Sequence, residues 1–442
     1  MMGKTNFING KIFTQDPEQP YFSCGYLKID GNRITEVGPM SSYCKEEGEQ
    51  ESNLKYQVVL PGIIHSHSHF YGQLIRGLPM NISPVNWQQI LGEMWWQVDK
   101  KLDDEMNYYS AMLGLLDGIE CGTTTYIDHQ ASPYHSRGSL EQLKAAMDLV
   151  GARGVLAYEV TDRDGKELAR NGIEENRSFV KNNNKPGNRV KGAFGLHASY
   201  TLNDDTLSEC METVHELDCG IHIHVAEDMA DVADSYRRCN KHVVERLNDF
   251  GVLGPKTIAA HCVHVGPAER AIFKETGTMV AHNCQSNTNN AVGTAPVWEM
   301  LQEGICVALG GDGYCYDSFK ELTFAAMLQK LSHHDPRIMG GKDQEKLLFS
   351  NNFHIAGQFF DGIGALKKGN LADFITIDYE EPTPLNESNL ISHLTSGFSG
   401  NVDTVVIDGK MIYKGKEFIE LDSEAIRAKC REQAERLWKY FA

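Results

Sequence analysis

The sequence lacks the segments that membrane and secreted proteins need. Its 442 residues contain no run of about 18 consecutive apolar residues, the length of a membrane-crossing helix. The first ten residues, MMGKTNFING, contain no apolar signal core. We therefore expect a cytoplasmic protein with no membrane partner.

Cysteine pairs at metal-binding or redox spacing are also missing. The eleven cysteines are an odd number, lie scattered along the chain and form no Cys-x-x-Cys motif. This pattern argues against a disulfide framework and against a structural zinc site, and it indicates reduced thiols in a cytosol.

Positive charge is scarce. Lys and Arg number 42, Asp and Glu number 60, and the net charge is −18. Such a chain repels the phosphates of nucleic acids and of anionic membranes. We therefore expect a small-molecule partner and no nucleic acid.

The two ends of the chain carry short β-strand patterns. Asn-Gly or Asp-Gly turns occur within residues 7–13, 26–34 and 404–413. Neither end alone has enough strands for a stable core, so we expect residues 1–56 and 363–442 to pair into one composite β-sandwich domain. Within the second range, residues 423–441 predict a closing helix.

Residues 57–362 alternate short β-rich runs with helix-length stretches such as 203–218, which has a cap candidate at Asn203-Asp204. The runs are 57–64, 123–128, 155–160, 190–196, 220–226, 257–260, 278–281 and 305–309. Eight strand-plus-helix units predict an α/β fold, a (β/α)8 TIM-like barrel, in this range. An open doubly wound sheet is the alternative.

Three histidines follow the first of these runs at every second position: His65, His67 and His69. In an extended strand alternate side chains share a face, so one strand end would offer two imidazoles to one metal. The spacing alone is weak evidence, because polar histidines also occur in loops for no chemical reason.

Other predicted strands also end in polar residues. Barrels of this kind carry their chemistry at the carboxyl ends of the strands, so we expect these side chains to gather in one site. They are Asp128 and His129 after the second strand, His197 after the fourth, His222, His224 and Glu227 at the fifth, His261 after the sixth and Asp312 after the eighth.

A metal site can be assembled from this set. Two histidines of the first strand, with His224 and Asp312, would hold one ion and leave a position for water. Zinc suits such nitrogen and oxygen ligands, although iron or manganese would also be accepted. The ion would lower the pKa of its water towards about 7, and Glu227 would carry protons.

Each residue also has an ordinary structural interpretation. Taken singly, His224 would be a structural histidine, Glu227 a solvated carboxylate and Asp312 a turn former. His222 would belong to the metal's surroundings or to the core, and Trp87 would be a packing residue. Only the joint pattern favours a site.

Seven motifs, in their order along the chain, resemble those of the amidohydrolase superfamily, and within it the mononuclear aminohydrolase and chlorohydrolase-like branch. They are PGIIHSHSH at 61–69, GTT at 122–124, GLHASY at 195–200, HIHVAE at 222–227, AHCVH at 260–264, HNCQSN at 282–287 and LGGDG at 309–313. Two further phrases, IDHQASP at 127–133 and WWQVD at 95–99, resemble the SsnA-type aminohydrolases more narrowly.

The resemblance implies roles for individual residues. Glu227 would protonate a ring nitrogen of the substrate, and His261 would polarise the carbon under attack or steady the hydroxide. Asp312 would also take the proton of the metal-bound water, while His197 and Trp87 would contact the substrate. One divalent ion per chain, with Zn²⁺ the first choice and Fe²⁺ or Mn²⁺ as alternatives, would have these ligands: His67, His69, His224 and Asp312.

The chain departs from the family pattern at two positions. His65 stands where relatives often have Asp or Asn, and Gly311 replaces a common Thr before Asp312; the first change would alter the bonding around the metal or the choice of metal. No lysine follows the fourth predicted strand, where binuclear relatives carry a carbamylated lysine, so a binuclear site is disfavoured.

The sequence thus predicts a metal-dependent hydrolytic deaminase that acts on an amino-substituted nitrogen heterocycle, a purine, pyrimidine or imidazole catabolite. One alternative is hydrolysis of a ring C–N amide bond, or displacement of another leaving group, by the same metal hydroxide. A non-catalytic binding or scaffold protein is a second, which the presence of every ligand disfavours. By analogy with the architecture alone, we expect a homo-oligomer.

Overall fold

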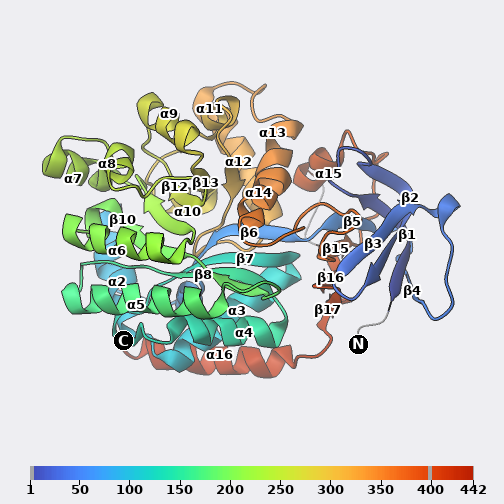
Figure 1. Ribbon diagram of the computed structural model, residues 1–442, viewed down its shortest axis with the longest axis horizontal. Helices are drawn as coiled ribbons and strands as arrows, with labels where there is room; N and C mark the ends of the chain where they lie inside the picture. Colours follow the sequence, from blue (N-terminus) through green and yellow to red (C-terminus); the bar gives the residue numbers. More distant parts are fainter. Residues whose placement is uncertain (1–3, 397–400, 442) are drawn as a thin grey trace.

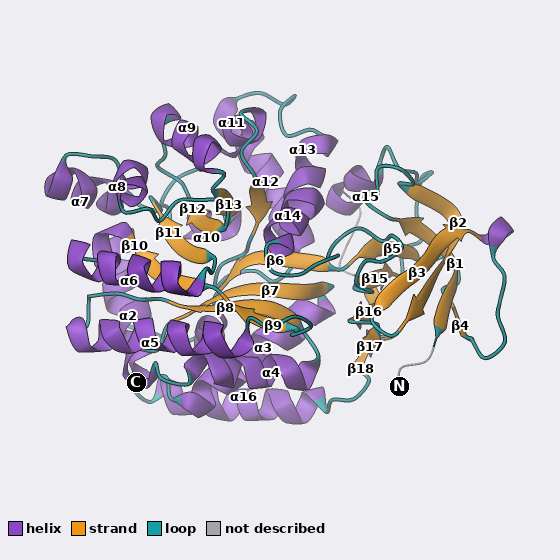
Figure 2. Ribbon diagram, in the orientation of Figure 1, coloured by secondary structure: helices purple, strands orange, loops and turns teal. Residues whose placement is uncertain are grey.

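The computed structural model describes residues 4–396 and 401–441. A barrel of parallel strands wrapped in helices forms the larger part, and a separate β-sheet lies beside it (Figures 1 and 2). The predicted ranges 1–56 and 363–442 include residues 1–3, 397–400 and 442, which lie outside the described residues.

The barrel closes in sequence order. Its strands form one sheet of four and one of five, which meet at parallel bridges between Val160 and Leu196 and between Ser68 and Asp312. The strands are β6 (Ile63–Ser68), β7 (Thr123–Gln130), β8 (Arg153–Tyr158), β9 (Val190–Gly192), β10 (Phe194–Ala198), β11 (Ile221–Val225), β12 (Thr257–His261), β13 (Met279–His282) and β14 (Val307–Leu309). Since β9 and β10 are one predicted strand broken at Ala193, the eightfold prediction is confirmed, and closure rules out the open sheet.

Helices and short turns connect and cover the strands. The predicted helix at 203–218 is confirmed, although the Asn203 side chain makes no capping hydrogen bond. The helices of this part are α1 (Trp87–Ile90), α2 (Trp96–Val98), α3 (Asp104–Glu120), α4 (Ser139–Val150), α5 (Lys166–Asn183), α6 (Asp204–Leu217), α7 (Met229–Cys239), α8 (Val243–Asp249), α9 (Pro267–Thr276), α10 (Cys284–Asn289), α11 (Val297–Gln302), α12 (Ser318–His333), α13 (Gly341–Glu345) and α14 (Asn351–Gly357).

The two ends of the chain meet in one nine-stranded sheet, as predicted, and its blue and red strands lie side by side in Figure 1. Its strands are β1 (Thr5–Phe13), β2 (Tyr21–Asp30), β3 (Arg33–Pro39), β4 (Gln50–Asn53), β5 (Val58–Pro61), β15 (Phe374–Ile377), β16 (Val402–Ile407), β17 (Lys410–Lys414) and β18 (Glu417–Phe418). A short helix, α15 (Leu390–Ser396), lies between β15 and β16 in the sequence.

The prediction of one barrel strand at 57–64 is wrong. Residues 58–61 form β5, which pairs with β1 and β15 in the terminal sheet, and the barrel strand β6 begins only at Ile63. The chain crosses between the two sheets at Gly62, where an added Cβ would lie 2.3 Å from the Thr124 hydroxyl oxygen. Only glycine fits this crossing.

The C-terminal helix α16 (Ser423–Trp438) packs on α3 of the barrel, below it in Figure 1. Its Trp438 indole donates to the Leu74 carbonyl oxygen at 2.8 Å. The prediction counted α16 with the terminal domain, but this helix lies on the barrel. It counted residues 58–61 with the barrel, but they pair in the terminal sheet. The two-domain division itself stays a prediction.

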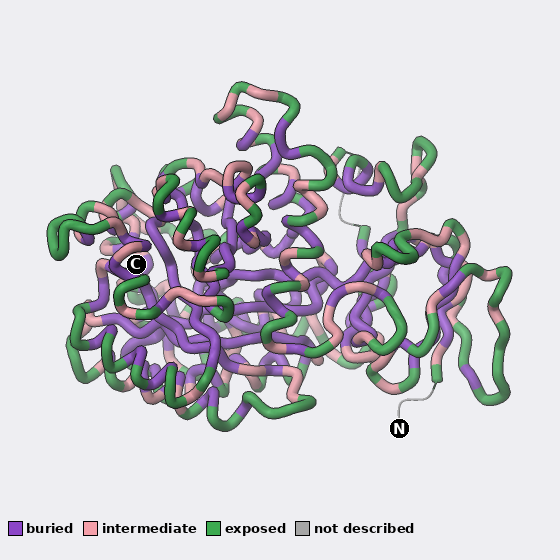
Figure 3. The backbone as a smooth tube through the Cα atoms, turned by 45° about the horizontal axis from the view of Figure 1, so that its top comes forward, coloured by how far each residue is buried: buried purple, intermediate pink, exposed green. Residues whose placement is uncertain are grey.

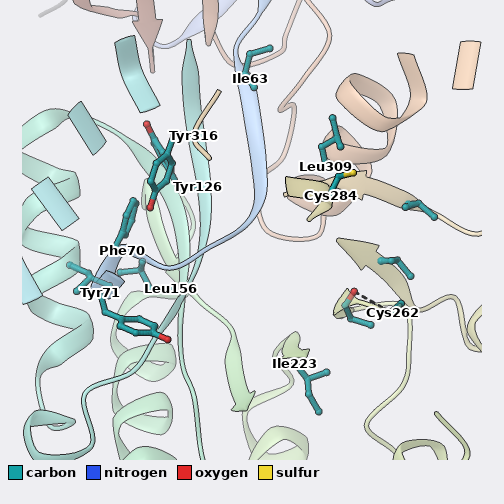
Figure 4. Close-up of a cluster of buried hydrophobic side chains, with 14 of the residues drawn as sticks. Ile63, Phe70, Tyr71, Tyr126, Leu156, Ile223, Cys262, Cys284, Leu309 and Tyr316 are labelled. Carbon is teal, nitrogen blue, oxygen red and sulfur yellow. Dashed lines mark hydrogen bonds between the residues drawn. The ribbon is translucent and has the colours of Figure 1, made fainter. Parts of the chain in front are cut away.

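The barrel strands are buried, and an apolar cluster fills the space between them and the helices. Figure 3 shows the inner part of the tube buried and the exposed segments at the periphery. Among the barrel strands only Lys191 of β9 is partly exposed, because the helices cover the strands from outside. In Figure 4 the rings of Phe70, Tyr126 and Tyr316 group together beside β6. All eleven cysteines are free thiols, as predicted, and no described helix is long and apolar enough to cross a membrane.

Candidate metal centre and active site

The end of β6 is fixed by a carboxylate that is not one of the four predicted ligands. Asp128 at the end of β7 accepts from the Phe70 amide at 2.7 Å and from the Ser68 hydroxyl at 3.1 Å. These bonds turn the chain directly after His69, so that His67 and His69 remain at the mouth of the barrel with their rings 4.7 Å apart.

Three imidazoles and one carboxylate converge at this mouth. Asp312 Oδ1 lies 3.0 Å from His69 Nε2 and 3.5 Å from His67 Nε2, and the Nε2 atoms of His69 and His224 are 3.1 Å apart. Ligand atoms around a tetrahedral zinc ion stand roughly 3.4 Å from one another. His67, His69 and Asp312 therefore form one group at distances that suit an ion, and His224 adjoins it through His69.

The other ring nitrogens are already occupied. His69 Nδ1 lies 2.6 Å from the His129 carbonyl oxygen, His224 Nδ1 lies 2.8 Å from the His197 carbonyl oxygen, and His67 Nδ1 lies 2.8 Å from His222 Nε2. A ring that donates from Nδ1 keeps its Nε2 lone pair for a metal. His67 Nε2 is buried without a hydrogen-bond partner among the described residues, as expected of a ligand atom.

The protonation states of His224 and His69 are also compatible with the binding of a cation. Burial and neighbouring imidazoles hold the pKa of His224 well below its usual range, so this ring is neutral. Burial alone would lower the pKa of His69, but Asp312 and Glu159 raise it to about 10. His69 thus carries a proton unless a metal ion takes the place of that proton.

The site residues sit on strained backbone. Ala226, His261 and Asp312 all take left-handed φ values, 45°, 71° and 57°, just after their strands or at a strand end. The Asp312 amide donates to the His67 carbonyl oxygen at 3.0 Å, which ties the last strand to the first. Left-handed conformations of such residues persist where the surrounding structure holds them, and they cluster at functional sites.

Glu227 and His261 lie beside the four predicted ligands. Burial, and then the charge of Asp312, raise the pKa of the Glu227 carboxyl well above its usual range. His261 Nδ1 lies 2.7 Å from Asn287 Oδ1 and 3.7 Å from Glu227 Oε1. A protonated carboxyl group next to an oriented imidazole can give a proton to a bound molecule.

A pocket of about 600 Å³, which includes its open mouth, extends from this centre. Both predicted substrate contacts, His197 and Trp87, line its wall. The His197 ring is held by a hydrogen bond between Nδ1 and the Thr201 hydroxyl at 2.7 Å. Trp87 begins the short helix α1, where the Asn86 side chain accepts from the Gln89 amide.

Several pocket residues were not predicted. Tyr71, Trp95 and Tyr200 add aromatic rings to the wall, and Glu159, directly after β8, adds a further carboxylate. Burial raises the pKa of Glu159 to about 7. The signal for Glu159 was available, since it is the one acidic residue within the apolar run 155–160.

Two other histidines of the sequence motifs lie outside the set of four. His264 Nε2 contacts the Val292 carbonyl oxygen at 2.8 Å, away from the pocket lining. His65 points toward Ser318, with its Nδ1 3.3 Å from the hydroxyl oxygen, and stacks on Tyr316. His65 belongs to none of the candidate metal groups formed by the described residues.

The two departures from the family pattern, His65 and Gly311, lie next to each other. A Cβ at Gly311 would lie 2.6 Å from two ring atoms of His65 and 1.9 Å from the Cys315 carbonyl oxygen. The His65 ring therefore occupies the space beside Gly311 that a threonine side chain would need.

We expect Gly311→Ala to lower the free energy of unfolding by about 1–3 kcal/mol, because the added methyl group overlaps main-chain atoms. Thermal or denaturant unfolding measures this. Gly341→Ala, with nothing within 4 Å of its Cβ, is the matched control. Removing the His65 ring as well should not restore stability, since the Cys315 carbonyl remains; equal stability of Gly311→Ala and wild type would contradict the packing described.

Comparison with known proteins decides the family. The sequence profile of the Amidohydrolase family matches residues 58–412. The chain belongs to the amidohydrolase family. A 5-methylthioadenosine/S-adenosylhomocysteine deaminase of Thermoanaerobacter pseudethanolicus is 31% identical over 435 residues, which cover 97% of this amidohydrolase and 98% of the relative. A 5'-deoxyadenosine deaminase of Methanosarcina mazei is 30% identical over 97% of each chain.

A solved structure shows the same fold. An adenosine deaminase from Xanthomonas campestris with bound zinc matches with a TM-score of 0.88 and 22% identity over 99% of each chain. The predicted barrel with its composite β-sandwich is thus confirmed. So is the predicted enzyme class: this amidohydrolase is a metal-dependent aminohydrolase that acts on carbon–nitrogen bonds.

Proposed function

We propose that this enzyme is a mononuclear zinc deaminase of the SsnA-type branch, and that its metal ligands are His67, His69, His224 and Asp312. The observation that carries the assignment is that Asp312 lies 3.0–3.5 Å from the Nε2 atoms of His69 and His67 and that His224 lies 3.1 Å from His69, with the second nitrogen of each ring occupied. A nitrogen and oxygen set of this kind suits zinc. When bound, the ion would lower the pKa of a water molecule so that hydroxide forms near neutral pH.

The protein's own residues divide the remaining work. Asp312 accepts the proton that the attacking water loses. Glu227 gives its proton to the ring nitrogen beside the reacting carbon and takes up the second proton of the water, which it passes to the leaving amine. The proton held by Asp312 then restores Glu227. The water oxygen becomes bonded to the carbon, the carbon–nitrogen bond breaks, and ammonia leaves. His261, held by Asn287, polarises the carbon under attack.

The substrate we propose is a small, flat amino-substituted nitrogen heterocycle of the purine, pyrimidine or imidazole type. The pocket wall supports this, because Trp87 and His197 provide planar surfaces near the ligand set. The two curated relatives, which deaminate adenosine compounds by their names, support a purine-like ring.

The test is ammonia release by the zinc-loaded protein from aminopurines, aminopyrimidines and aminoimidazoles. We expect stoichiometric ammonia and a carbonyl product from at least one class. Loss of substrate without ammonia would instead show ring opening by the same site. No reaction with any compound, in protein that binds one zinc ion per chain, would overturn the proposed deamination.

A further inference from the structure

Glu159 is a carboxylate in the pocket to which the proposed mechanism gives no task. It follows β8, its main chain is fixed by a hydrogen bond from its amide to the Gln130 carbonyl oxygen at 2.9 Å, and its side chain is 3% exposed. Its Oε1 atom is buried and has no hydrogen-bond partner among the residues that the structure describes. A buried acceptor without a partner costs free energy, so this oxygen can gain a hydrogen bond from a molecule bound in the pocket.

The neighbouring imidazoles do not satisfy this oxygen. His69 Nδ1 is 3.4 Å from Oε1, but that nitrogen already bonds the His129 carbonyl oxygen at 2.6 Å. His129 Nδ1 is 3.6 Å from Oε1, and His197 Nε2 is 3.9 Å from Oε2, both beyond hydrogen-bond distance. The three rings surround Glu159 without using its acceptor capacity.

Glu159 and Glu227 reach the pocket from different parts of the barrel. Glu159 follows β8 and lies next to His69 of the β6 segment, whereas Glu227 follows β11 and lies next to His261 of β12. Both line the same pocket as Asp312. A ring whose reacting carbon faces the four ligands would therefore have one carboxylate on each side.

The chemistry of these carboxylates limits the ring. Glu227 serves the nitrogen that gains a proton on one side of the reacting carbon. The buried Oε1 oxygen of Glu159 is an acceptor without a partner among the described residues, so the atom that faces it on the other side should carry a hydrogen. In a 6-aminopurine that neighbour is a carbon atom without hydrogen. In a 2-amino-4-oxopyrimidine ring, the pattern that the six-membered ring of guanine shares, it is an N–H group.

We propose that Glu159 accepts a hydrogen bond from a ring N–H beside the carbon that loses its amine. The preferred substrate then carries a cyclic guanidine unit, in which the aminated carbon stands between a ring nitrogen and a ring N–H, as in guanine or isocytosine. Hydrolysis converts this unit into a cyclic urea and ammonia. The inference rests on the proposed deamination and specifies its substrate class.

The first experiment uses the wild-type, zinc-loaded protein. Ammonia release is compared among guanine, 1-methylguanine, isocytosine, adenine and adenosine. We expect kcat/KM for guanine or isocytosine to exceed that for adenine and adenosine by at least about 100-fold, since a site built for an N–H rejects rings that lack it. Methylation at N1 of guanine should cost about as much, because it removes the donor and adds bulk beside Glu159.

The second experiment uses Glu159→Gln, which keeps an acceptor oxygen, and Glu159→Leu, which removes it at similar volume. We expect kcat/KM for the N–H substrate to fall about tenfold and at least about 100-fold, respectively, with one zinc ion per chain retained. The penalty for N1-methylation should shrink to within tenfold in Glu159→Leu. Glu212→Gln, an exposed carboxylate on α6, is the matched control.

The outcomes distinguish the proposed deamination from the proposed role of Glu159. Faster ammonia release from adenine or adenosine than from guanine and isocytosine would leave the proposed deamination intact and overturn the role of Glu159. An unchanged methylation penalty in Glu159→Leu would overturn it too, since a merely structural role would not alter selectivity. No ammonia from any ring would overturn the deaminase and this inference together.

Discussion

Glu227→Gln is expected to lower ammonia release by at least about 10³-fold while the protein keeps its metal. The amide fills the same space but cannot donate an acidic proton, and proton transfer of this kind contributes about 10²–10⁴-fold to enzymatic rates. Glu227 is not among the four proposed ligands, so the metal content of the variant, measured by elemental analysis, should equal that of wild type.

The control is Glu275→Gln, an exposed carboxylate on α9, which should leave both activity and metal content unchanged. The key comparison is turnover per bound metal ion, because it separates lost chemistry from lost metal. Activity of Glu227→Gln within tenfold of wild type would show that another group carries the proton.

Replacing His224 by alanine is expected to reduce the bound metal to a small fraction of one ion per chain and to abolish ammonia release. Three proposed ligands would remain, and His69 would again hold its proton beside Asp312. A chelator should remove the activity of wild type as well, and zinc should restore wild type but not His224→Ala.

Substitutions of two further histidines should have smaller effects on metal binding. His222 contacts His67 but is not one of the proposed ligands, so His222→Ala should weaken zinc affinity by about 10–100-fold without abolishing binding. His264, which contacts the Val292 carbonyl instead, serves as the control. Full metal occupancy and activity in His224→Ala would show that the ligand assignment is wrong.

Much of the site could be predicted because its residues follow a geometric rule. Parallel strands closed into a barrel bring their carboxyl ends to one mouth, so His67, His224 and Asp312 meet although they lie far apart in the sequence. Alternation along the strand further placed His67 and His69 on one side. Both inferences need only the strand positions, which the apolar runs mark clearly.

The division between β5 and β6 could not be predicted in the same way. The apolar run continues from Val58 to Ile64, and a strand of the terminal sheet has the same composition as a buried barrel strand. What separates them is the close approach of Gly62 to Thr124, which depends on residues about 60 positions apart. The role proposed for Glu159 was missed for a similar reason, because only the folded barrel shows that its Oε1 atom lacks a partner among the described residues.

The crossing at Gly62 makes the terminal sheet and the metal centre parts of one thermodynamic unit. Only Gly62 separates β5, held between β1 and β15, from β6, which leads into His67 and His69. We therefore expect cation binding at the proposed ligands His67 and His69 to oppose local unfolding of the sheet as well, and fraying of β15 or β5 to reduce the affinity for the cation. The terminal sheet would thus stabilise the position of β6, the strand that leads to the proposed ligands. Substitutions in the sheet would then change the affinity for the metal without altering any residue of the active site.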